Sequence, residues 1–211
     1  MPGDPGGPGD PGDPGEADRD PGEDGDTMKK TPLLYLNSAA CTAKFRLHGF
    51  HTSLVACEGR LPILSGTGTV RIGKRFVIRG RVAPCELSAD DNGQLLIGDR
   101  VFLNHGVVIA ARESIEIGED TKIGDFSAIL DSNYHDLDPT HPDKPRPVTI
   151  GKNVWLGNGV LVLPGSTIGD HTVVAARSVV KGTLPPRVLA AGNPAVVVRQ
   201  LEIPDGWRRG L

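Results

Sequence analysis

Residues 147–182 read PVTIGKNVWLGNGVLVLPGSTIGDHTVVAARSVVKG, and an aliphatic residue recurs in this stretch at every sixth position. The recurring positions are Ile150, Leu156, Val162, Ile168, Val174 and Val180. A strand alternates every two residues and an amphipathic helix repeats about every 3.6, so a period of six predicts a hexapeptide β-helix. The aliphatic residue of each hexad points into the shaft, and the small residue that follows four of them permits a tight turn. Three hexads complete one coil, and coils stack about 4.8 Å apart.

The same period extends toward the amino terminus in two registers. They are Ile97, Leu103 and Ile109, and then Ile117, Ile123 and Ile129. The offset of two residues between them predicts a bulge or short insertion near residues 112–114, and a weaker beginning of the pattern lies at 70–82. Strands of a β-sandwich are the alternative, but their turns would fall at irregular spacings of about 8–12 residues. We therefore expect an all-β fold, a parallel β-helix over residues 67–183.

The two ends of the chain differ from the repeat. Residues 1–27 consist mainly of Gly, Pro and Asp and carry nine acidic residues against one basic residue, which predicts a disordered tail. Residues 28–66 are expected to cap the open end of the shaft, with a short helix at 33–47, because an uncovered coil exposes unpaired backbone groups. Residues 184–211 form a carboxy-terminal segment.

Composition limits the classes of protein that fit. The tail has a net charge of −8 and the whole chain −3, so the remaining chain is +5, which suits an anionic ligand and gives no reason to infer nucleic acid. No apolar run approaches the roughly 18 residues of a membrane span, and no signal peptide is recognisable, so we expect a cytoplasmic protein. Cys41, Cys57 and Cys85 form no paired motif, which predicts reduced thiols.

The repeat stops after Ile129 and resumes at Val148, which predicts an external loop over residues 131–147, DSNYHDLDPTHPDKPRP. Loops on a rigid scaffold often carry catalytic groups. Histidine titrates near neutral pH and can act as a general base, so His135 and His141 are candidates, although a loop histidine is often a solvated residue. Three carboxylates are close enough in sequence to orient an imidazole: Asp131, Asp136 and Asp138.

Residues 147–182, followed by LPPRVLAAGNPAVVVRQL at 184–201, resemble the carboxy-terminal half of the hexapeptide-repeat O-acetyltransferases. That family includes maltose, galactoside and surface-polysaccharide O-acetyltransferases, and the resemblance covers roughly residues 68–201. Its most specific pieces are GKNVWLG at 151–157, LPG at 163–165 and AGNP at 191–194. The resemblance implies a left-handed coil, a homotrimer, acetyl-CoA bound between neighbouring prisms and no metal.

The resemblance also implies roles for individual residues. His135 matches the catalytic histidine, although the sugar enzymes place theirs in a Gly-His-Pro setting. Asn104 matches a residue that holds the acceptor, and the backbone of Gly157 and Asn158 lies near the thioester. The implied cofactor contacts are Trp155, Ala176, Lys181 and Arg199. Two cations of the family pattern are replaced here by Val196 and Gly182, for which Arg177, Arg187 or Lys152 could substitute.

Several of these residues have a structural alternative. Trp155 could simply cover the outer face of the prism, and Asn104 could form a side-chain ladder inside the coil. His105, beside Asn104, could line the acceptor pocket or be merely exposed.

The leading function is transfer of an acetyl group from acetyl-CoA to a hydroxyl of a sugar, glycan precursor or glycosylated small molecule. A metal-dependent enzyme of the carbonic-anhydrase-like kind is one alternative, with zinc held by His105, His135 and His141 across subunits. A non-catalytic trimeric scaffold is the other. Neither the acceptor nor the choice between O- and N-acetylation can be read from these residues.

Overall fold

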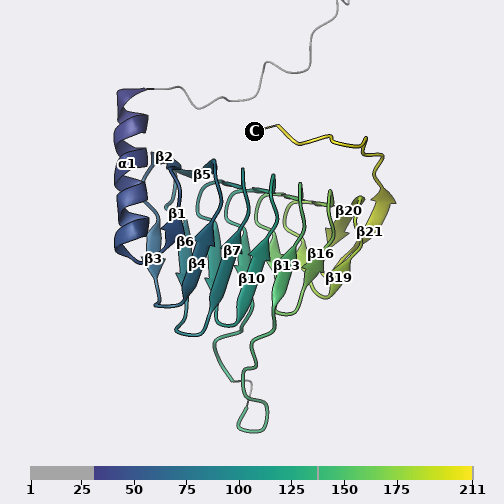
Figure 1. Ribbon diagram of the computed structural model, residues 1–211. Helices are drawn as coiled ribbons and strands as arrows, with labels where there is room; N and C mark the ends of the chain where they lie inside the picture. The colour runs from purple at the N-terminus through teal and green to yellow at the C-terminus, as the bar shows by residue number, and fades with distance from the viewer. Residues whose placement is uncertain (1–30, 137, 211) are drawn as a thin grey trace, which may run out of the picture.

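The computed structural model describes residues 31–136 and 138–210, which form a parallel β-solenoid of about six coils with one helix across its first coil (Figure 1). Sheet A contains β1 (His51–Thr52), β4 (Thr69–Ile72), β7 (Gln94–Ile97), β10 (Ser114–Ile117), β13 (Val148–Ile150), β16 (Thr167–Ile168) and β19 (Thr183–Leu184). Sheet B contains β2 (Val55–Gly59), β5 (Phe76–Gly80), β8 (Phe102–Leu103), β11 (Lys122–Ile123), β14 (Trp155–Leu156), β17 (Val173–Val174), β20 (Val188–Gly192) and β21 (Ala195–Gln200). Sheet C contains β3 (Ile63–Ser65), β6 (Glu86–Ala89), β9 (Val108–Ala111), β12 (Ala128–Leu130), β15 (Leu161–Val162) and β18 (Val179–Val180).

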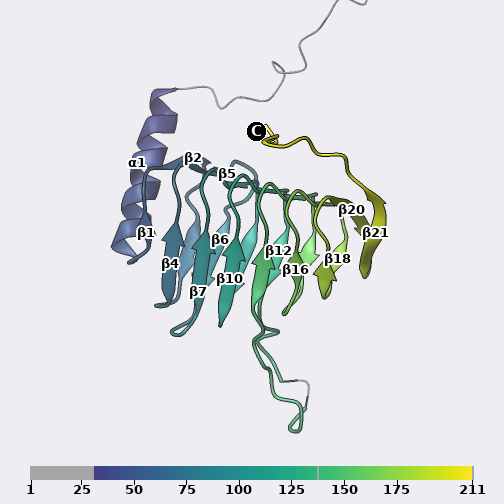
Figure 2. The ribbon, with the colours of Figure 1, turned by 45° about the vertical axis from the view of Figure 1, so that its right-hand side comes forward.

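The three sheets meet at three corners, which we call AB, BC and CA after the sheets that they join in chain order. Figure 2 shows the coils stacked side by side, with the strands of one sheet parallel. The described strands are parallel except for β21, which pairs antiparallel with β20. The expected hexapeptide β-helix is confirmed, and the left-handed coil stays an expectation from the resemblance.

The core is a stack of aliphatic side chains in register. Ile150 lies beside Ile168 in sheet A, and Leu156 lies beside Val174 in sheet B. All four are at most 1 % exposed. Burial of such a side chain contributes about 1.5–3 kcal/mol relative to leaving it in water. The six-residue period therefore arises because each side of a coil is six residues long and directs one of these aliphatic side chains inward.

The small residue after the aliphatic one is required for a different reason from the one expected. A Cβ at Gly157 would lie 2.6 Å from the backbone nitrogen of Ala176 in the next coil. The left-handed backbone of the neighbouring corner falls instead on non-glycine residues, such as Asn153 at φ 53° and His171 at φ 62°. Glycine is thus selected by the close approach of adjacent coils rather than by the turn.

The solenoid is longer at both ends than the sequence pattern indicated. Its first coil begins at His51 rather than near residue 67, because β1 supplies no aliphatic hexad for the period to register. At the other end β19 and β20 continue sheets A and B beyond residue 183. The two-residue offset in the hexads falls between β9 and β10, which are four residues long and are joined by a turn at 112–113.

The helix α1 (Pro32–Leu47) confirms the expected helix at 33–47 and covers the first coil. Thr31 caps it, its hydroxyl accepting from the Leu34 N–H at 3.2 Å. The Ser38 and Thr42 hydroxyls accept from the Cys57 and Val55 N–H groups of β2 at 3.1 and 3.0 Å. These bonds satisfy donors that an open sheet edge would leave unpaired.

The expected disorder of residues 1–27 lies outside the described residues. The three cysteines are free, as expected, and all three are buried. Across residues 31–136 and 138–210, no helix combines the length and hydropathy that a membrane span needs.

Candidate functional site at two corners of the prism

The external loop leaves the prism at corner CA, between β12 and β13, and projects away from the coils (Figures 1 and 2). The solenoid is undisturbed by it, since β13 pairs with β10 in register, Ile117 beside Ile150. The loop is therefore an insertion into a finished scaffold, as the interrupted repeat predicted.

Asp131 fixes the beginning of this loop. Its side chain is fully buried, and its two carboxylate oxygens accept from the backbone N–H groups of Arg112, Glu113 and Ser114, each at 2.8 Å. These three residues are the turn between β9 and β10 and the first residue of β10. The carboxylate is thus occupied in joining two adjacent coils and is not directed at His135.

Asp143 fixes the returning arm of the loop. Its carboxylate accepts from the Ser132 hydroxyl and from the Asn133 and Tyr134 N–H groups, at 3.1 and 3.2 Å for the two backbone donors. Arg112 adds an ion pair at 3.0 Å. The Ser132 hydroxyl, followed by these backbone donors and the Arg112 charge, holds the pKa of Asp143 below its ordinary value.

Tyr134 lies against the solenoid and directs the next residue outward. Its ring packs beneath the Arg112 guanidinium at 5.6 Å, and its backbone is left-handed at φ 64°, which is uncommon for a bulky residue. Burial, together with the charges of Asp90 and Asp131, raises the pKa of Tyr134 to about 12. An unusual backbone conformation therefore stands immediately before His135.

His135 is exposed and forms no hydrogen bond or ion pair within the described residues. Asp136 accepts from the Asp143 N–H at 2.7 Å, and Asp138 accepts from His141 Nδ1 at 2.9 Å. None of the three candidate carboxylates contacts His135 within one chain. His141 is the histidine that has an aspartate partner, although its side chain is 72 % exposed.

Corner BC contains four of the expected site residues, namely Asn104, Gly157, Asn158 and Ala176. The Asn158 carbonyl accepts from the Arg177 N–H of the next coil at 2.8 Å, beside Ala176. The Gly157 N–H donates to the Val174 carbonyl at 2.8 Å, whereas the Asn158 N–H has no partner among the described residues. Of the two expected backbone donors, Asn158 is therefore the one left free for a ligand.

Asn104 stands two coils before Asn158 at this corner. Its Oδ1 and the neighbouring His105 Nδ1 are both buried and lack a hydrogen-bond partner in the described part of the chain. Buried polar atoms are usually satisfied, so both are suited to a group that is supplied from outside the chain. The side-chain ladder considered for Asn104 is not formed.

The expected cofactor residues are divided among three places. Trp155 and Arg199 line one cavity of about 530 Å³ between sheet B and the carboxy-terminal segment. Ala176 is at corner BC, and Lys181 is exposed at corner CA, two coils beyond the loop. Trp155 also lines a second cavity of about 390 Å³ with Lys122 and the terminal residues 207, 209 and 210.

The carboxy-terminal segment is held over sheet B by Asn153. The Asn153 side chain donates to the Trp207 carbonyl at 3.1 Å and accepts from the Arg209 N–H at 2.9 Å. Burial lowers the pKa of Lys122, whose side chain lines the cavity under this segment. Neither Trp207 nor Lys122 was predicted from the sequence, because neither belongs to a local motif.

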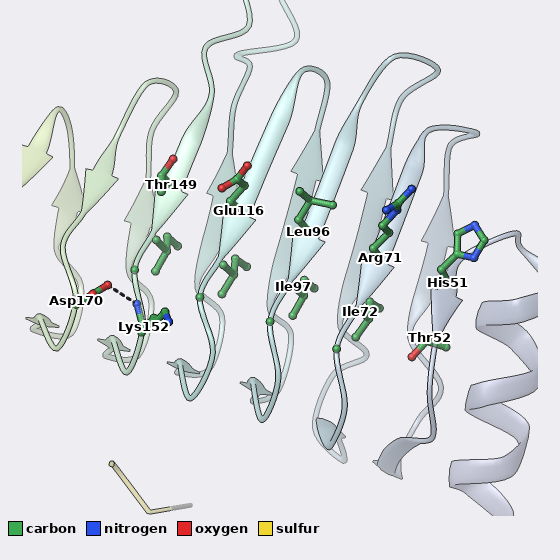
Figure 3. A pocket seen from close by; sticks show the side chains of 16 residues that line it. His51, Thr52, Arg71, Ile72, Leu96, Ile97, Glu116, Thr149, Lys152 and Asp170 are labelled. Atoms are coloured by element: carbon green, nitrogen blue, oxygen red, sulfur yellow. Dashed lines mark hydrogen bonds between the residues drawn. The ribbon is translucent and has the colours of Figure 1, made fainter. Parts of the chain in front are cut away.

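A further groove contains one residue considered above, Lys152, which was a candidate substitute for the missing cofactor cations. It has a volume of about 860 Å³ and runs across sheet A at corner AB. Figure 3 shows its outward row, Thr149, Glu116, Leu96, Arg71 and His51, one residue per coil. Its size alone does not make it the site, because the loop and corner BC lie elsewhere.

The sheets differ in the side chains that they direct outward. Sheet A directs outward mainly polar residues, including Glu116, Thr149, Thr167 and Thr183. Sheet C directs outward Glu86 in β6 and then, from β9 to β18, the aliphatic residues Val108, Ala128, Leu161 and Val179. Corners BC and CA are the two borders of sheet C, so the loop and the Asn104–Asn158 corner flank an apolar face.

Comparison with known proteins identifies the family of this chain. The family described as bacterial transferase hexapeptide (six repeats) matches residues 147–182. WbbJ of Escherichia coli strain K12, named for O-acetyl transfer in lipopolysaccharide biosynthesis, is 35 % identical over 145 residues, 63 % of this chain and 72 % of its own. The chain belongs to the hexapeptide-repeat O-acetyltransferase family. YJL218W of Saccharomyces cerevisiae, named an acetyltransferase, is 32 % identical over 197 residues, 88 % of this chain and 92 % of its own.

A solved member of this fold is AntD, an N-acyltransferase from Bacillus cereus, in complex with dTDP and 3-hydroxybutyryl-CoA. It matches with a TM-score of 0.59 at 20 % identity, over 76 % of this chain and 88 % of its own. Among the described residues of this chain, no group of three His, Cys, Asp or Glu is placed to hold a metal ion. His105 lies at corner BC and His135 and His141 in the loop at corner CA, so one chain does not bring the three histidines together.

Proposed function

We propose that this protein transfers an acetyl group from acetyl-CoA to a hydroxyl of a sugar, glycan precursor or glycosylated small molecule, with His135 as the general base. The observation that carries the proposal is the position of His135 and of the Asn104–Asn158 corner at opposite borders of the apolar sheet C. Within one chain, the base and the free N–H donor belong to different corners.

A closed ring of three chains would bring these two borders together. In such a ring the contact is heterologous, so one border of sheet C on each chain meets the opposite border on the next chain. Burying Val108, Ala128, Leu161 and Val179 would stabilise the ring through the hydrophobic effect. The loop of one subunit then lies beside Asn104 and Asn158 of its neighbour, and the homotrimer supplies a complete site.

Acetyl-CoA as the donor substrate fits residues of corners BC and CA together with the cavity on the neighbouring sheet B. Trp155 and Ala176 offer an apolar wall, and Lys181 and Arg199 offer cations for the phosphates. Arg177, at corner BC, is exposed and compensates for the positive charges that are missing at Val196 and Gly182. The acyl-CoA in the AntD structure and the acetyl transfer named for WbbJ support an acyl-CoA donor.

The transfer is a direct displacement. An alcohol attacks poorly at neutral pH because its proton is held tightly, so His135 removes that proton as the oxygen adds to the thioester carbonyl. The Asn158 N–H stabilises the negative charge that develops on the carbonyl oxygen. The tetrahedral intermediate then expels the CoA thiolate, which takes from His135 the proton that the alcohol gave up. No covalent enzyme intermediate is required when both substrates are held in line.

An amine acceptor is the second candidate, because AntD is an N-acyltransferase of the same fold. The same base and the same donor would serve an amine. The chemistry differs only in the atom that attacks.

The test is release of CoA thiol from acetyl-CoA with a panel of sugars, nucleotide sugars and amino sugars. His135→Ala is expected to lower kcat by at least about 10²-fold with little change in acetyl-CoA binding. His141→Ala is the matched control, an exposed histidine of the same loop that already pairs with Asp138. Near-normal turnover by His135→Ala, or an equal loss in both variants, would remove His135 from the mechanism. Absence of turnover with every acceptor would favour the scaffold alternative.

A further inference from the structure

The outward face of α1 carries an apolar stripe that nothing in the described chain covers. Its members are Leu33, Leu36, Ala40, Ala43 and Leu47, all exposed. The three leucines are 66, 68 and 89 % exposed. The helix lies across the outer end of the solenoid in Figures 1 and 2, so this stripe faces away from the first coil.

The fold does not use this stripe. The opposite side of the same helix carries the buried residues Ser38, Cys41, Thr42 and Phe45, and Phe45 packs edge-on against Phe50 and Phe76. The exposed residues are spaced alternately by three and four, which is the a/d spacing of helices that pair. An exposed contiguous apolar surface of this kind marks an association site.

We propose that the α1 stripe binds the α1 stripe of a second copy of this chain, antiparallel about a two-fold axis, and so joins two rings at their amino-terminal ends. The proposal rests on the homotrimer of the proposed function. An isologous contact of this kind uses the same surface on both partners.

The order of side chains in the stripe is self-complementary. When two copies run antiparallel with the axis between Cys41 and Thr42, Leu36 of one helix lies opposite Leu47 of the other. Ala40 then lies opposite Ala43 at the centre, where small side chains allow the backbones to approach closely. The two larger pairs lie on either side of this central contact.

Charge also favours a second copy in this direction. Lys44 and Arg46 lie in the last turn of α1, and the chain enters the helix from residues 1–30, which carry nine acidic and three basic residues, net −6. In an antiparallel pair, the start of each α1, where the acidic segment joins it, lies near the last turn of the other helix, which carries Arg46. The two helix dipoles also point in opposite directions, which is favourable. The same acidic segment disfavours an anionic membrane surface as the occupant of the stripe.

A single helix pair would be too small to persist. Stable interfaces bury about 800 Å² per partner, more than five side chains of one helix supply. Two rings of three chains form three such helix pairs. Once the first pair has formed, the remaining helices face each other at a high effective concentration, so the three contacts strengthen one another. The expected assembly is a pair of rings rather than a pair of lone chains.

The test compares native mass by light scattering for the full-length wild type and for Ala40→Glu. Ala40 is exposed and near the centre of the stripe, so a glutamate there leaves the single chain intact and places charge at the contact. Wild type is expected to have twice the mass of Ala40→Glu. Tyr35→Glu adds the same charge to another side of α1, at a residue 61 % exposed, and should retain the wild-type mass.

Three results would overturn the proposal. Equal masses for wild type and Ala40→Glu would show that the stripe joins nothing. A fall of the variant to a single chain would place the stripe inside the ring. Flotation of wild type, but not of Ala40→Glu, with vesicles of phosphatidylcholine and phosphatidylglycerol would identify a membrane as the occupant. Thiol release measured on the same samples separates this proposal from the catalytic one, since half-mass rings should keep their turnover.

Discussion

Replacing Asp131 by asparagine should destabilise the fold at the root of the external loop. The wild-type carboxylate is fully buried and accepts three backbone N–H bonds, from Arg112, Glu113 and Ser114, at 2.8 Å each. An asparagine of the same shape keeps one oxygen and presents an NH₂ group where the second oxygen was. At least one backbone donor then faces another donor, and the bonds that remain lose their charge assistance.

The magnitude follows from the number of bonds affected. Hydrogen bonds to a charged group contribute about 1.5–3 kcal/mol each, so weakening this cluster should cost about 3 kcal/mol. For a chain of this size each kcal/mol lowers Tm by about 2–4 °C, which gives a fall of about 6–12 °C. Thermal unfolding followed by circular dichroism at fixed protein concentration measures it.

Asp136→Asn is the matched control, because that carboxylate is exposed and accepts one bond, from the Asp143 N–H. Its Tm should change little. An Asp131→Asn shift below about 2 °C, or a shift no larger than that of the control, would refute the assignment of Asp131 as the joint between two coils.

Two further predictions concern the loop and the oxyanion donor. Because the pKa of Asp143 is held below its ordinary value, its stabilising effect is present above about pH 4 and is lost as pH falls through the depressed pKa. Urea midpoints measured from neutral pH downward should therefore fall more steeply in wild type than in Asp143→Asn, and parallel curves would contradict this. Asn158→Pro, which removes the free N–H, should lower kcat by about 10²–10³-fold, while Asn158→Ala, which keeps it, should stay near wild type. Equal losses in the proline and alanine variants would assign the effect to the side chain instead.

The fold was predictable because the hexad is a property of consecutive residues. Each inward position, such as Ile150 or Leu156, is separated from the next by a constant number of residues, so one line of sequence contains the whole period. The first coil escaped prediction because β1 is His51–Thr52 and offers no aliphatic residue to the pattern. The external loop could be located from the sequence because it interrupts the six-residue period.

The site was less accessible to sequence reasoning. Arg112 pairs with Asp143, 31 residues further along the chain, and nothing local marks either residue. The engagement of the Gly157 N–H depends on Val174 in the next coil. Contacts between coils join residues whose separation changes with every insertion, so only the three-dimensional stack identifies them.

The division of the site between two corners is the central claim, and mixing two inactive variants tests it most directly. His135→Ala chains retain Asn104, and Asn104→Ala chains retain His135; in a ring that contains both, one junction recovers both wild-type groups. After the two variants are unfolded, mixed in equal amounts and refolded, thiol release should return to about a quarter of the wild-type rate, the random-mixing expectation for a ring of three. No recovery above the two parent variants, although mixed rings form, would show that the base and the acceptor-binding corner belong to the same chain.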